Sequence, residues 1–492
     1  MENKMNTAGS QNSTEENSPN GINGNTIDSE PLDLDGMTDF ELADVFLQRC
    51  AIIKIEGELH CFNGKHFVLL DDKQLNRLIW SAFQNEKKQI RSSKKIKAIA
   101  DALRLYEFPD YQESDQWLAF ENGFLNIVGW QFDELNKGYY PPCVTYNLRC
   151  SYDFTMHHSL SIISFGYNSV DEFMGNIHFP PTPTADYFFS RVTNSDPMLI
   201  QRIYEMIGYL LVPDTHAKSF FLLQGVPNSG KSVLGRFIEG FFPKQCVTAL
   251  DISRLSGQFL PKSLATSRLN LSMDLPDGLL SKKAVAMLKM LTGDDLVTLE
   301  VKYKEARPYR GQCKFLFSIN GKLKMYGRDT AFLDRIVCIP FVNSIPKTEW
   351  DKYLLLKLDN EREGIMMKAL FYYRFLSKRN GKFSGDYPPD VEFRLSENET
   401  IEEFVSECCD LMESFSSYTD DLYSAYQAFC SINNLRPVRS KSGFAQRLSG
   451  LYPTKIKATR WREDNRNIRG FNGIILKTKV ADAYKNDGKS EN

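Results

Sequence analysis

The chain has 492 residues, of which 42% are hydrophobic, and its formal net charge is −2. This length suffices for about three domains, and the near-neutral balance excludes a protein that binds nucleic acid through its overall charge. The ten cysteines are scattered without a CxxC pair, so we expect neither a zinc site nor a disulfide framework. No apolar run approaches about 18 residues and the N-terminus lacks a basic-then-apolar signal, which predicts a soluble protein of the cytoplasm and no membrane contact.

The N-terminal part begins with a polar segment. Residues 1–36 carry seven acidic residues against one lysine, which predicts a disordered tail because too little apolar surface can be buried there. The run DFELADVFLQRC then predicts a helix, and IIKIEGELHCF and HFVLLD predict strands. A basic, helix-compatible stretch follows at 87–97. A solvated helix face explains this stretch better than a nucleic-acid contact.

The middle of the chain changes character along its length. WLAFENGFLNI, from Trp117, predicts two short strands around an Asn-Gly turn, and residues near 170–212 look helical. Between 220 and 341 apolar strands alternate with amphipathic helices, which is typical of an α/β sheet. A helical stretch near 350–380 and a linker with Gly and Pro near 381–390 lead to a last domain.

A phosphate-binding loop lies within the α/β segment. The stretch GVPNSGKS follows the apolar run SFFLLQ and precedes VLGRFIEGFF, which has its large apolar residues on one helical face. Such a strand–loop–helix unit cradles phosphates with backbone N–H groups and the helix N-terminus. Lys231 would reach the β- and γ-phosphates and Ser232 would bind Mg²⁺. We therefore expect ATP to bind at Gly225, Val226, Pro227, Asn228, Ser229, Gly230, Lys231 and Ser232.

Three later motifs add polar residues to predicted strands. LNLSMDLPD ends a strand at Asp274, with Asp277 close behind, and a carboxylate on the strand beside the phosphate loop can hold Mg²⁺ or orient the attacking water. KFLFSIN ends in Asn320, and FLDRIVCIPF places Arg335 at the start of a strand. Taken alone, Asn320 fits a turn and Arg335 fits an ordinary surface position. The order of lysine, carboxylate, amide and arginine along one sheet favours catalytic roles.

This ordered series, with LKMLTGDD and VKYKE between its second and third motifs, resembles the superfamily 3 helicases. More narrowly, it resembles the helicase part of phage and plasmid primase-helicases and their poxvirus relative. The resemblance covers roughly 110–345 and extends more weakly over 400–480. It implies a ring-forming AAA+ motor, usually a hexamer, that moves on single-stranded DNA in a 3′→5′ sense. It also implies that Asn320 is the sensor amide and that Arg335 is an arginine finger acting on a neighbour's ATP.

The sequence departs from this family in two respects. The family's second motif commonly ends in glutamate, whereas here it ends in Asp274, which can bind Mg²⁺, act as the base or do both, with Asp277 sharing the work. Ahead of Trp117 there is no paired-carboxylate and histidine set for metal-dependent polymerisation. We therefore expect a helicase without a primase domain.

The fold class expected from these observations is α/β, with an AAA+ P-loop ATPase core, an α+β N-terminal region and a C-terminal winged-helix domain. The expected segments are a disordered acidic tail (1–36), a small α+β region (37–110), a partly helical pre-helicase domain (111–212), the superfamily 3 ATPase core (213–345), a helical segment and linker (346–400), a winged-helix-like nucleic-acid-binding domain (401–480) and a flexible tail (481–492).

Two regions are candidates for DNA contact. In the resembling family, the segment after the second motif forms a hairpin that grips DNA in the ring channel, which favours Lys302 and Lys304, with Tyr303 for stacking and Lys289 as a weaker candidate. An ordinary exposed hairpin is the alternative. The C-terminal stretch 436–479 holds twelve Lys/Arg against two acids, a nucleic-acid footprint. There KSGFAQRLSGLY is the candidate recognition helix and KIKATRWRE and FNGIILK are the candidate wing strands, with DNA contacts at Arg447, Arg460 and Arg462.

Three functions remain open from the sequence. The first is an ATP- and Mg²⁺-dependent DNA helicase, a homo-hexamer that replicates a phage, plasmid or other mobile element in a bacterial or virus-infected cytoplasm. The second is a DNA-binding AAA+ initiator or regulator that remodels DNA without processive unwinding. The third, a small-molecule kinase, would not account for the basic C-terminal stretch or for the residues around Arg335.

Overall fold

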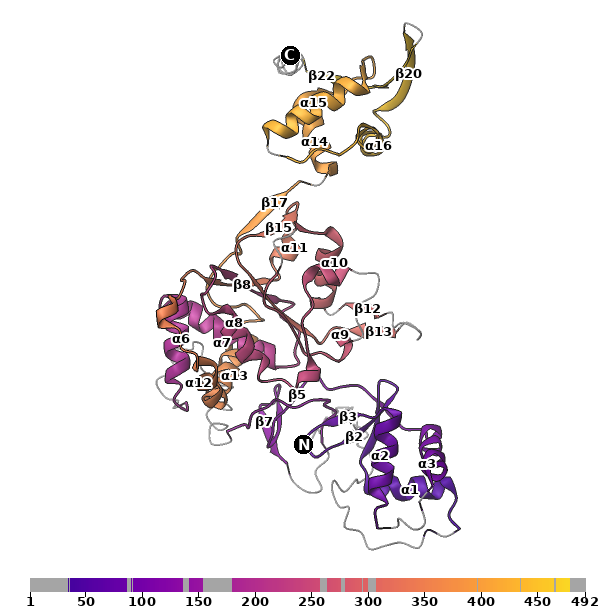
Figure 1. Cartoon of the computed structure of the whole chain (residues 1–492), viewed down its shortest axis with the longest axis vertical. Helices are drawn as coiled ribbons and strands as arrows, with labels where there is room; N and C mark the ends of the chain where they lie inside the picture. The colour runs from indigo at the N-terminus through magenta and orange to yellow at the C-terminus, as the bar shows by residue number, and fades with distance from the viewer. Residues whose placement is uncertain are drawn as a thin grey trace, which may run out of the picture.

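The computed structural model contains an N-terminal lobe (36–111), a central lobe (117–395) and a C-terminal lobe (397–477). The outer lobes lie at opposite ends of the molecule, with the central lobe between them (Figure 1). No described helix is long and apolar enough to cross a membrane. The expected tails, 1–36 and 481–492, lie outside the described residues apart from Leu34 and Gly36. The described residues are 34, 36–85, 90, 92–135, 141–153, 179–256, 263–275, 279–293, 295–299, 307–395, 397–433, 435–463 and 466–477.

The N-terminal lobe packs three helices beside a small sheet of strand order β3–β2–β1–β4. Thr38 and Asp71 each begin a helix with a capping box, which satisfies backbone N–H groups of the first turn. Apolar side chains of the three helices, including Phe46 and Ile79, form one core. The helix and strands expected here are confirmed. The elements are α1 (Asp39–Arg49), β1 (Ile52–Ile55), β2 (Glu58–Phe62), β3 (Phe67–Leu69), α2 (Asp72–Ala82), α3 (Ser93–Leu105) and β4 (Asp110–Tyr111).

The central lobe begins with a three-stranded antiparallel sheet of β5 (Trp117–Ala119), β6 (Gly123–Asn126) and β7 (Gln131–Glu134). The first two strands are the expected pair around the Asn-Gly turn. Phe120 of this segment is fully buried and belongs to the same core as the helices that follow it. This small sheet therefore shares a core with the rest of the central lobe.

A parallel five-stranded sheet forms the centre of this lobe, in the order β16–β8–β14–β10–β9. The expected α/β sheet is confirmed, but one neighbour differs from expectation. The strands beside the phosphate-loop strand β8 are β16 and β14, so β10, which leads to Asp274, is one strand further away. Sequence order does not reveal such a crossover. The strands are β8 (Phe220–Gly225), β9 (Val247–Thr248), β10 (Leu269–Ser272), β14 (Lys314–Ile319) and β16 (Ile336–Phe341).

The two faces of the sheet are buried in two different cores. Along β8, Phe221 and Leu223 point into one core while Phe220 and Leu222 point into the other, as the two-residue period of a strand requires. Because both faces are covered, this strand reads as a continuous apolar run in the sequence. One core is covered by α6 (Pro183–Thr193), α7 (Pro197–Leu211), α8 (Lys231–Glu239), α12 (Leu354–Asn360) and α13 (Arg362–Lys378).

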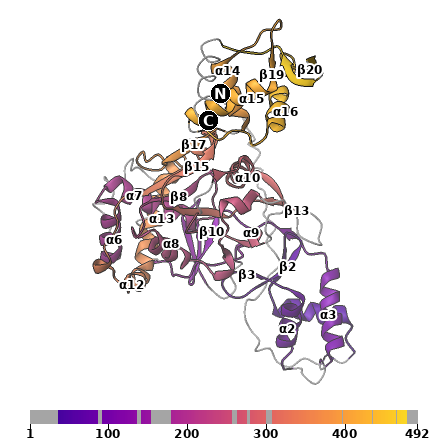
Figure 2. The same ribbon diagram turned by 45° about the horizontal axis from the view of Figure 1, so that its top comes forward.

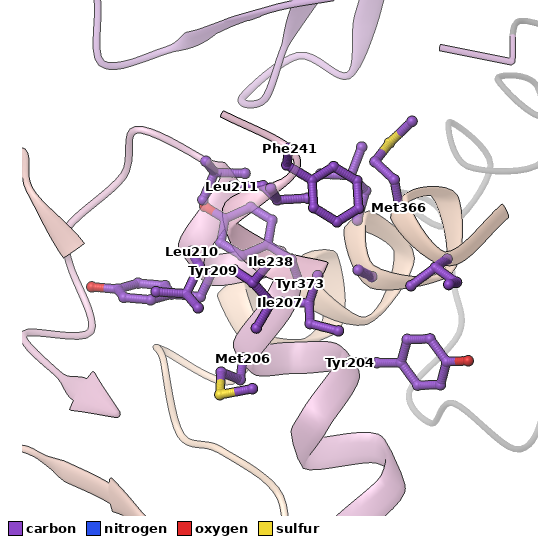
Figure 3. Packing of buried hydrophobic residues seen from close by; sticks show 14 of the residues in the cluster. Tyr204, Met206, Ile207, Tyr209, Leu210, Leu211, Ile238, Phe241, Met366 and Tyr373 are labelled. Atoms are coloured by element: carbon purple, nitrogen blue, oxygen red, sulfur yellow. The ribbon is translucent and has the colours of Figure 1, made fainter. Parts of the chain in front are cut away.

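The long helices α7 and α13 pack closely against each other beneath the sheet. Gly208 permits this approach, since a Cβ atom there would lie 2.2 Å from the carbonyl oxygen of Ala369. Figure 3 shows Tyr204, Ile207 and Tyr373 at this contact, with side chains from both helices interleaved. These helices anchor the chain before the phosphate loop to the chain after the last strand of the sheet.

The opposite face of the sheet carries shorter elements and a hairpin. Ser281 caps α10 with its side chain, and the helix ends at Thr292, directly before Gly293. Beyond it, β12 and β13 pair as an antiparallel hairpin on the same side of the molecule as α10 (Figure 2). A small sheet, β11–β15–β17, leads toward the C-terminal lobe. These elements are α9 (Ser263–Thr266), β11 (Leu279–Leu280), α10 (Lys282–Thr292), β12 (Leu296–Leu299), β13 (Arg307–Arg310), β15 (Leu323–Tyr326), α11 (Thr330–Leu333) and β17 (Val391–Arg394). The central lobe also contains 3-10 turns at Lys244–Cys246, Ile252–Ser256 and Lys347–Glu349.

The C-terminal lobe combines three helices with short strands around its own core, which includes Phe404, Tyr426 and Phe444. The expected recognition helix forms as α16. The second wing strand was expected at 471–477, which is wrong as one strand, because β21 ends at Asn472 and residues 475–476 belong to β22. Gly473 causes this break: its φ is +95°, and a Cβ atom there would lie 2.0 Å from the Lys455 carbonyl oxygen. The elements are α14 (Glu397–Cys408), β18 (Cys409–Asp410), β19 (Ser416–Tyr418), α15 (Thr419–Ile432), α16 (Lys441–Leu451), β20 (Lys457–Glu463), β21 (Arg466–Asn472) and β22 (Ile475–Leu476).

A buried lysine lies at the start of β14. The Lys314 side chain donates a hydrogen bond to the backbone oxygen of Asp214, and its nitrogen lies 3.5 Å from the centroid of the Tyr209 ring. Burial lowers the pKa of Lys314 to about 7, although the nearby Asp214 acts in the opposite direction. The folded protein therefore binds this proton more weakly than the unfolded chain does.

We expect this lysine to make the stability of the protein depend on pH. Between the folded pKa of about 7 and an unfolded value of about 10.4, the unfolded chain binds more protons. The free energy of unfolding should therefore rise with pH in that window, by up to about 1.4 kcal/mol per pH unit. Urea unfolding from pH 6.5 to 10 should show a flatter dependence for Lys314→Met than for the wild type. Equal slopes would contradict the assignment.

Candidate functional site

The phosphate loop has the geometry that its sequence predicts. It leaves β8 at Gly225 and enters α8 at Lys231. Gly225 has φ +155°, and a Cβ atom there would lie 1.9 Å from the Phe341 oxygen; at Gly230, with φ +99°, a Cβ atom would lie 2.9 Å from the Phe188 ring. Only glycine fits at these two positions. The first turn of α8 therefore directs its free N–H groups toward a space that suits an anion.

Lys231 lies within the loop and is largely buried. Its ammonium donates hydrogen bonds to the Val226 oxygen at 2.6 Å, the Ser229 hydroxyl at 3.1 Å and the Gly225 oxygen at 3.2 Å. Burial lowers the pKa of Lys231, and the Asp274 carboxylate partly offsets this effect. A buried cation held only by neutral oxygens gains strongly from a phosphate group.

Two polar side chains from neighbouring strands lie beside the loop. The Asn320 amide, after β14, donates a hydrogen bond of 3.3 Å to the carboxylate of Asp274, which follows β10. Both line the same cleft as Lys231 and Ser232. The structure thus brings together four of the residues that the sequence predicts for catalysis or metal binding. Asp277 lies outside the described residues.

The cleft has a volume of about 830 Å³ and is partly open. This falls within the range of about 300–1,000 Å³ for small-molecule sites and suits a nucleoside triphosphate. Its second wall comes from α6 and residues 345–357, which include Tyr187, Arg191 and Trp350. An ion pair between Arg191 and Glu349 joins these two segments. No sequence pattern indicates this wall, because its two parts lie far apart along the chain.

The donor set fits Mg²⁺. Mg²⁺ keeps several water ligands and is usually held by one or two carboxylates together with substrate phosphates. Ser232 is exposed in the first turn of α8 and Asp274 faces the same cleft. Within the described part of the chain no group of three or more His, Cys, Asp or Glu side chains could hold a metal by itself. A bound phosphate would therefore complete the ligand set.

Gln224, the residue before the loop, makes contacts that the sequence analysis missed. Its amide nitrogen donates to the oxygens of Gly321 at 2.7 Å and Asp390 at 2.8 Å, and its amide oxygen accepts from the Asp390 N–H at 2.8 Å. Gly321 follows Asn320, and Asp390 precedes β17, the strand that leads to the C-terminal lobe (Figure 1). Gln224 therefore joins the phosphate loop, the amide-bearing strand end and the connection to the C-terminal lobe.

Arg335 lies away from the cleft. Its backbone oxygen accepts a hydrogen bond from Phe220 N at the start of β8, whereas the phosphate loop follows the end of that strand. Six residues of strand separate the two ends, or about 20 Å at about 3.3 Å per residue. The Arg335 guanidinium donates to the Ala331 oxygen, and no ion pair holds it within the described residues. It cannot reach the nucleotide of its own chain from this position.

The residues proposed for DNA contact differ in their surroundings. Lys289 pairs with Asp329 at 2.7 Å, so its ammonium is not free. Lys302, Tyr303 and Lys304 lie outside the described residues, although the strands that flank them do pair as a hairpin. Arg447 forms an ion pair with Glu397. Arg460 and Arg462 are exposed on β20.

Comparison with known proteins finds two family models. Residues 223–335 match a family of unknown function, DUF5906, and residues 396–487 match the poxvirus D5 protein-like family. The second match confirms the resemblance to the poxvirus relative of the superfamily 3 helicases. It falls on the C-terminal region, where the likeness carried by the sequence motifs is weaker. No curated protein matches the chain.

Solved structures similar to this chain include two apo structures of the NrS-1 C-terminal region. The match to the A form covers 89% of this chain and 100% of the NrS-1 chain, with 11% sequence identity and a TM-score of 0.43. The match to the other structure covers 88% of this chain and 99% of the NrS-1 chain, with 11% sequence identity and a TM-score of 0.45.

We predict that Lys231→Ala abolishes nucleoside triphosphate hydrolysis without unfolding the protein. The lysine contacts only oxygens of its own loop, so removing it deletes a phosphate ligand and relieves the cost of burying a charge. Hydrolysis assays and thermal unfolding of the two proteins check this. A well-folded variant with near-normal turnover would exclude this loop as the hydrolytic site.

Proposed function

We propose that the chain is an ATP- and Mg²⁺-dependent DNA helicase that works as a ring, a homo-hexamer, and moves on single-stranded DNA. Its cellular role would be the replication of a phage, plasmid or other mobile element. The observation that carries the proposal is the meeting of Lys231, Asp274 and Asn320 in one cleft, next to a phosphate loop on a parallel sheet. The match to the poxvirus D5 protein-like family supports it.

The residues of the cleft divide the work of hydrolysis. Lys231 and the N–H groups of α8 would hold the β- and γ-phosphates, and Ser232 and Asp274 would hold Mg²⁺, which neutralises charge that develops on the phosphates. Asn320, which hydrogen-bonds to Asp274, would position the attacking water. Asp274 lines the cleft and would accept that water's proton, alone or together with Asp277.

The position of Arg335 supports assembly. Because it lies at the edge of the sheet opposite its own phosphate loop, a catalytic role requires the nucleotide of an adjacent subunit. In that role the guanidinium would stabilise charge on the transferred phosphoryl group. A ring then follows if each subunit offers Arg335 to the next, since a head-to-tail contact that closes generates a cycle.

The hairpin β12–β13 and the C-terminal lobe supply the proposed DNA contacts. In the sequence, Lys302 and Lys304 lie between the two strands of this hairpin. The order of α15, α16 and the ribbon β20–β21 would suit a winged helix, which would bind duplex DNA during loading. A DNA-binding initiator that hydrolyses ATP without separating strands is the alternative function, and the basic C-terminal lobe alone would suit it equally.

Mixing two inactive variants tests the role of Arg335 in a neighbouring subunit. Lys231→Ala and Arg335→Ala should each lose hydrolysis, Arg335→Ala by about 10³–10⁵ in rate, as known arginine fingers do. In mixed rings, an intact phosphate loop can meet an intact Arg335 of the adjacent subunit. Partial hydrolysis should therefore return at intermediate ratios. Failure at every ratio, with mixed assembly verified, would contradict action between subunits.

Changing Lys302 and Lys304 tests the proposed contact with single-stranded DNA in the ring channel. Lys302→Ala/Lys304→Ala should keep duplex affinity, because the C-terminal lobe supplies that contact, but should lose stimulation of hydrolysis by single-stranded DNA. The measurement is the hydrolysis rate against the concentration of oligonucleotide. Lys282→Ala/Lys283→Ala, on exposed positions of α10, makes the same change of charge and serves as the control. Normal stimulation in the hairpin variant would place the channel contact elsewhere.

A further inference from the structure

A two-stranded ribbon projects from the C-terminal lobe. Strands β20 and β21 pair along their whole length, but the third strand, β19, pairs with β21 only from Gly470 to Asn472. The remainder of the ribbon therefore has no neighbouring strand within the described residues and extends outward (Figure 1). Its base is fixed in the core of the lobe, where Phe471 is buried.

Arginines gather on one face of this ribbon. Arg460 lies directly opposite Arg469 in the register, and Arg462 lies two residues further along the same strand face. All three are exposed, and no hydrogen bond or ion pair holds them within the described residues. Directly opposed residues have Cβ atoms about 5 Å apart, so two like charges there repel each other. An anion bound across the pair would remove this repulsion.

The other face of the ribbon fixes its shape. The Trp461 ring covers Gly470, where a Cβ atom would lie 2.3 Å from the ring, and it meets the Tyr418 ring edge-on at 5.7 Å and 85°. The aromatic side chains thus occupy one face and leave the arginine face open. Because the ribbon already has a fixed shape, its guanidinium groups can bind a ligand without a loop first having to become ordered.

The cations of the neighbouring helix are engaged within the protein. Lys441 of α16 pairs with Asp420 at 2.5 Å, and Arg447 pairs with Glu397. Lys477 donates to the backbone oxygens of Ser406 and Glu407. The uncompensated positive charge of the described part of this lobe therefore lies more on the ribbon than on α16.

We propose that the arginine face of β20–β21 binds the phosphate backbone of duplex DNA and is the principal duplex contact of the C-terminal lobe. The proposal rests on the DNA-dependent function above and assigns its duplex-binding surface to the ribbon instead of α16. The major groove of B-DNA admits a two-stranded ribbon. Residues two apart on a strand are separated by about 6.7 Å, close to the axial rise of two phosphates on one DNA strand, about 6.8 Å. Arg460 and Arg462 can therefore contact nearby phosphates.

The test compares variants of the full chain for binding to a labelled duplex, and separately to a labelled single strand, over a range of salt concentrations. The ribbon variant is Arg460→Ala/Arg462→Ala/Arg469→Ala. The helix variant is Lys441→Ala/Arg447→Ala. A control variant, Lys73→Ala/Arg77→Ala/Lys244→Ala, removes three exposed positive charges elsewhere. Thermal unfolding verifies that each is folded, and within the described residues the ribbon variant loses no ion pair.

The ribbon variant should bind duplex DNA roughly tenfold or more weakly, because three arginines no longer neutralise phosphates. Its log–log salt slope should fall by about 0.9 for each such phosphate, or about 2.7 for three. The helix and control variants should stay within about twofold of the wild type. Lysine at the three ribbon positions should restore most of the slope, because the arginines bind phosphate and read no base. These results support the proposal.

Four results would overturn it. A wild-type chain that binds neither duplex nor single-stranded DNA would remove both this surface and the function on which it rests, whereas one that binds single-stranded DNA alone would overturn the duplex surface only. A wild-type chain that binds, with a ribbon variant that binds equally well, would overturn the ribbon alone and leave that function standing. A ribbon variant that loses single-stranded but not duplex binding would assign the face to single-stranded DNA.

Discussion

Parallel pairing of β8, β14 and β10 is the constraint on which the site depends. Parallel strands in register end at the same edge of a sheet, so the residues after Gly225, Ile319 and Ser272 must emerge together. Lys231 and Asn320 meet for this reason, although a long stretch of chain separates them. On the other side of β8, parallel pairing with β16 places Gly225 against the backbone of Phe341, where only glycine fits. Fold and site therefore have one physical cause.

The edge of the sheet is also where the lobes connect. Gln224 hydrogen-bonds with Gly321 and Asp390, so the end of the phosphate-loop strand is joined to the strand that continues into the C-terminal lobe. Arg335 lies at the opposite end of β8 from the phosphate loop. In the proposed ring, this position would let it act on the nucleotide of a second subunit.

Local patterns predicted the parts of the molecule that depend on nearby residues. The apolar run before GVPNSGKS and the Asn-Gly turn after Trp117 each specify their own element. Strand order could not be predicted in the same way, because no local pattern indicates that β14 lies between β8 and β10. The wall formed by α6 and residues 345–357 escaped prediction because it is assembled by tertiary packing. The second wing strand differs from the prediction because the backbone conformation of Gly473 ends β21 at Asn472.

Strand displacement measures the central claim most directly. The purified full chain is incubated with a forked duplex and either ATP with Mg²⁺ or a non-hydrolysable analogue, and release of the labelled strand is followed in time. A helicase of the proposed kind should release the strand only with ATP and should continue through duplexes of increasing length. Hydrolysis and DNA binding without any release of the strand would contradict this claim and identify an initiator that remodels DNA without unwinding it.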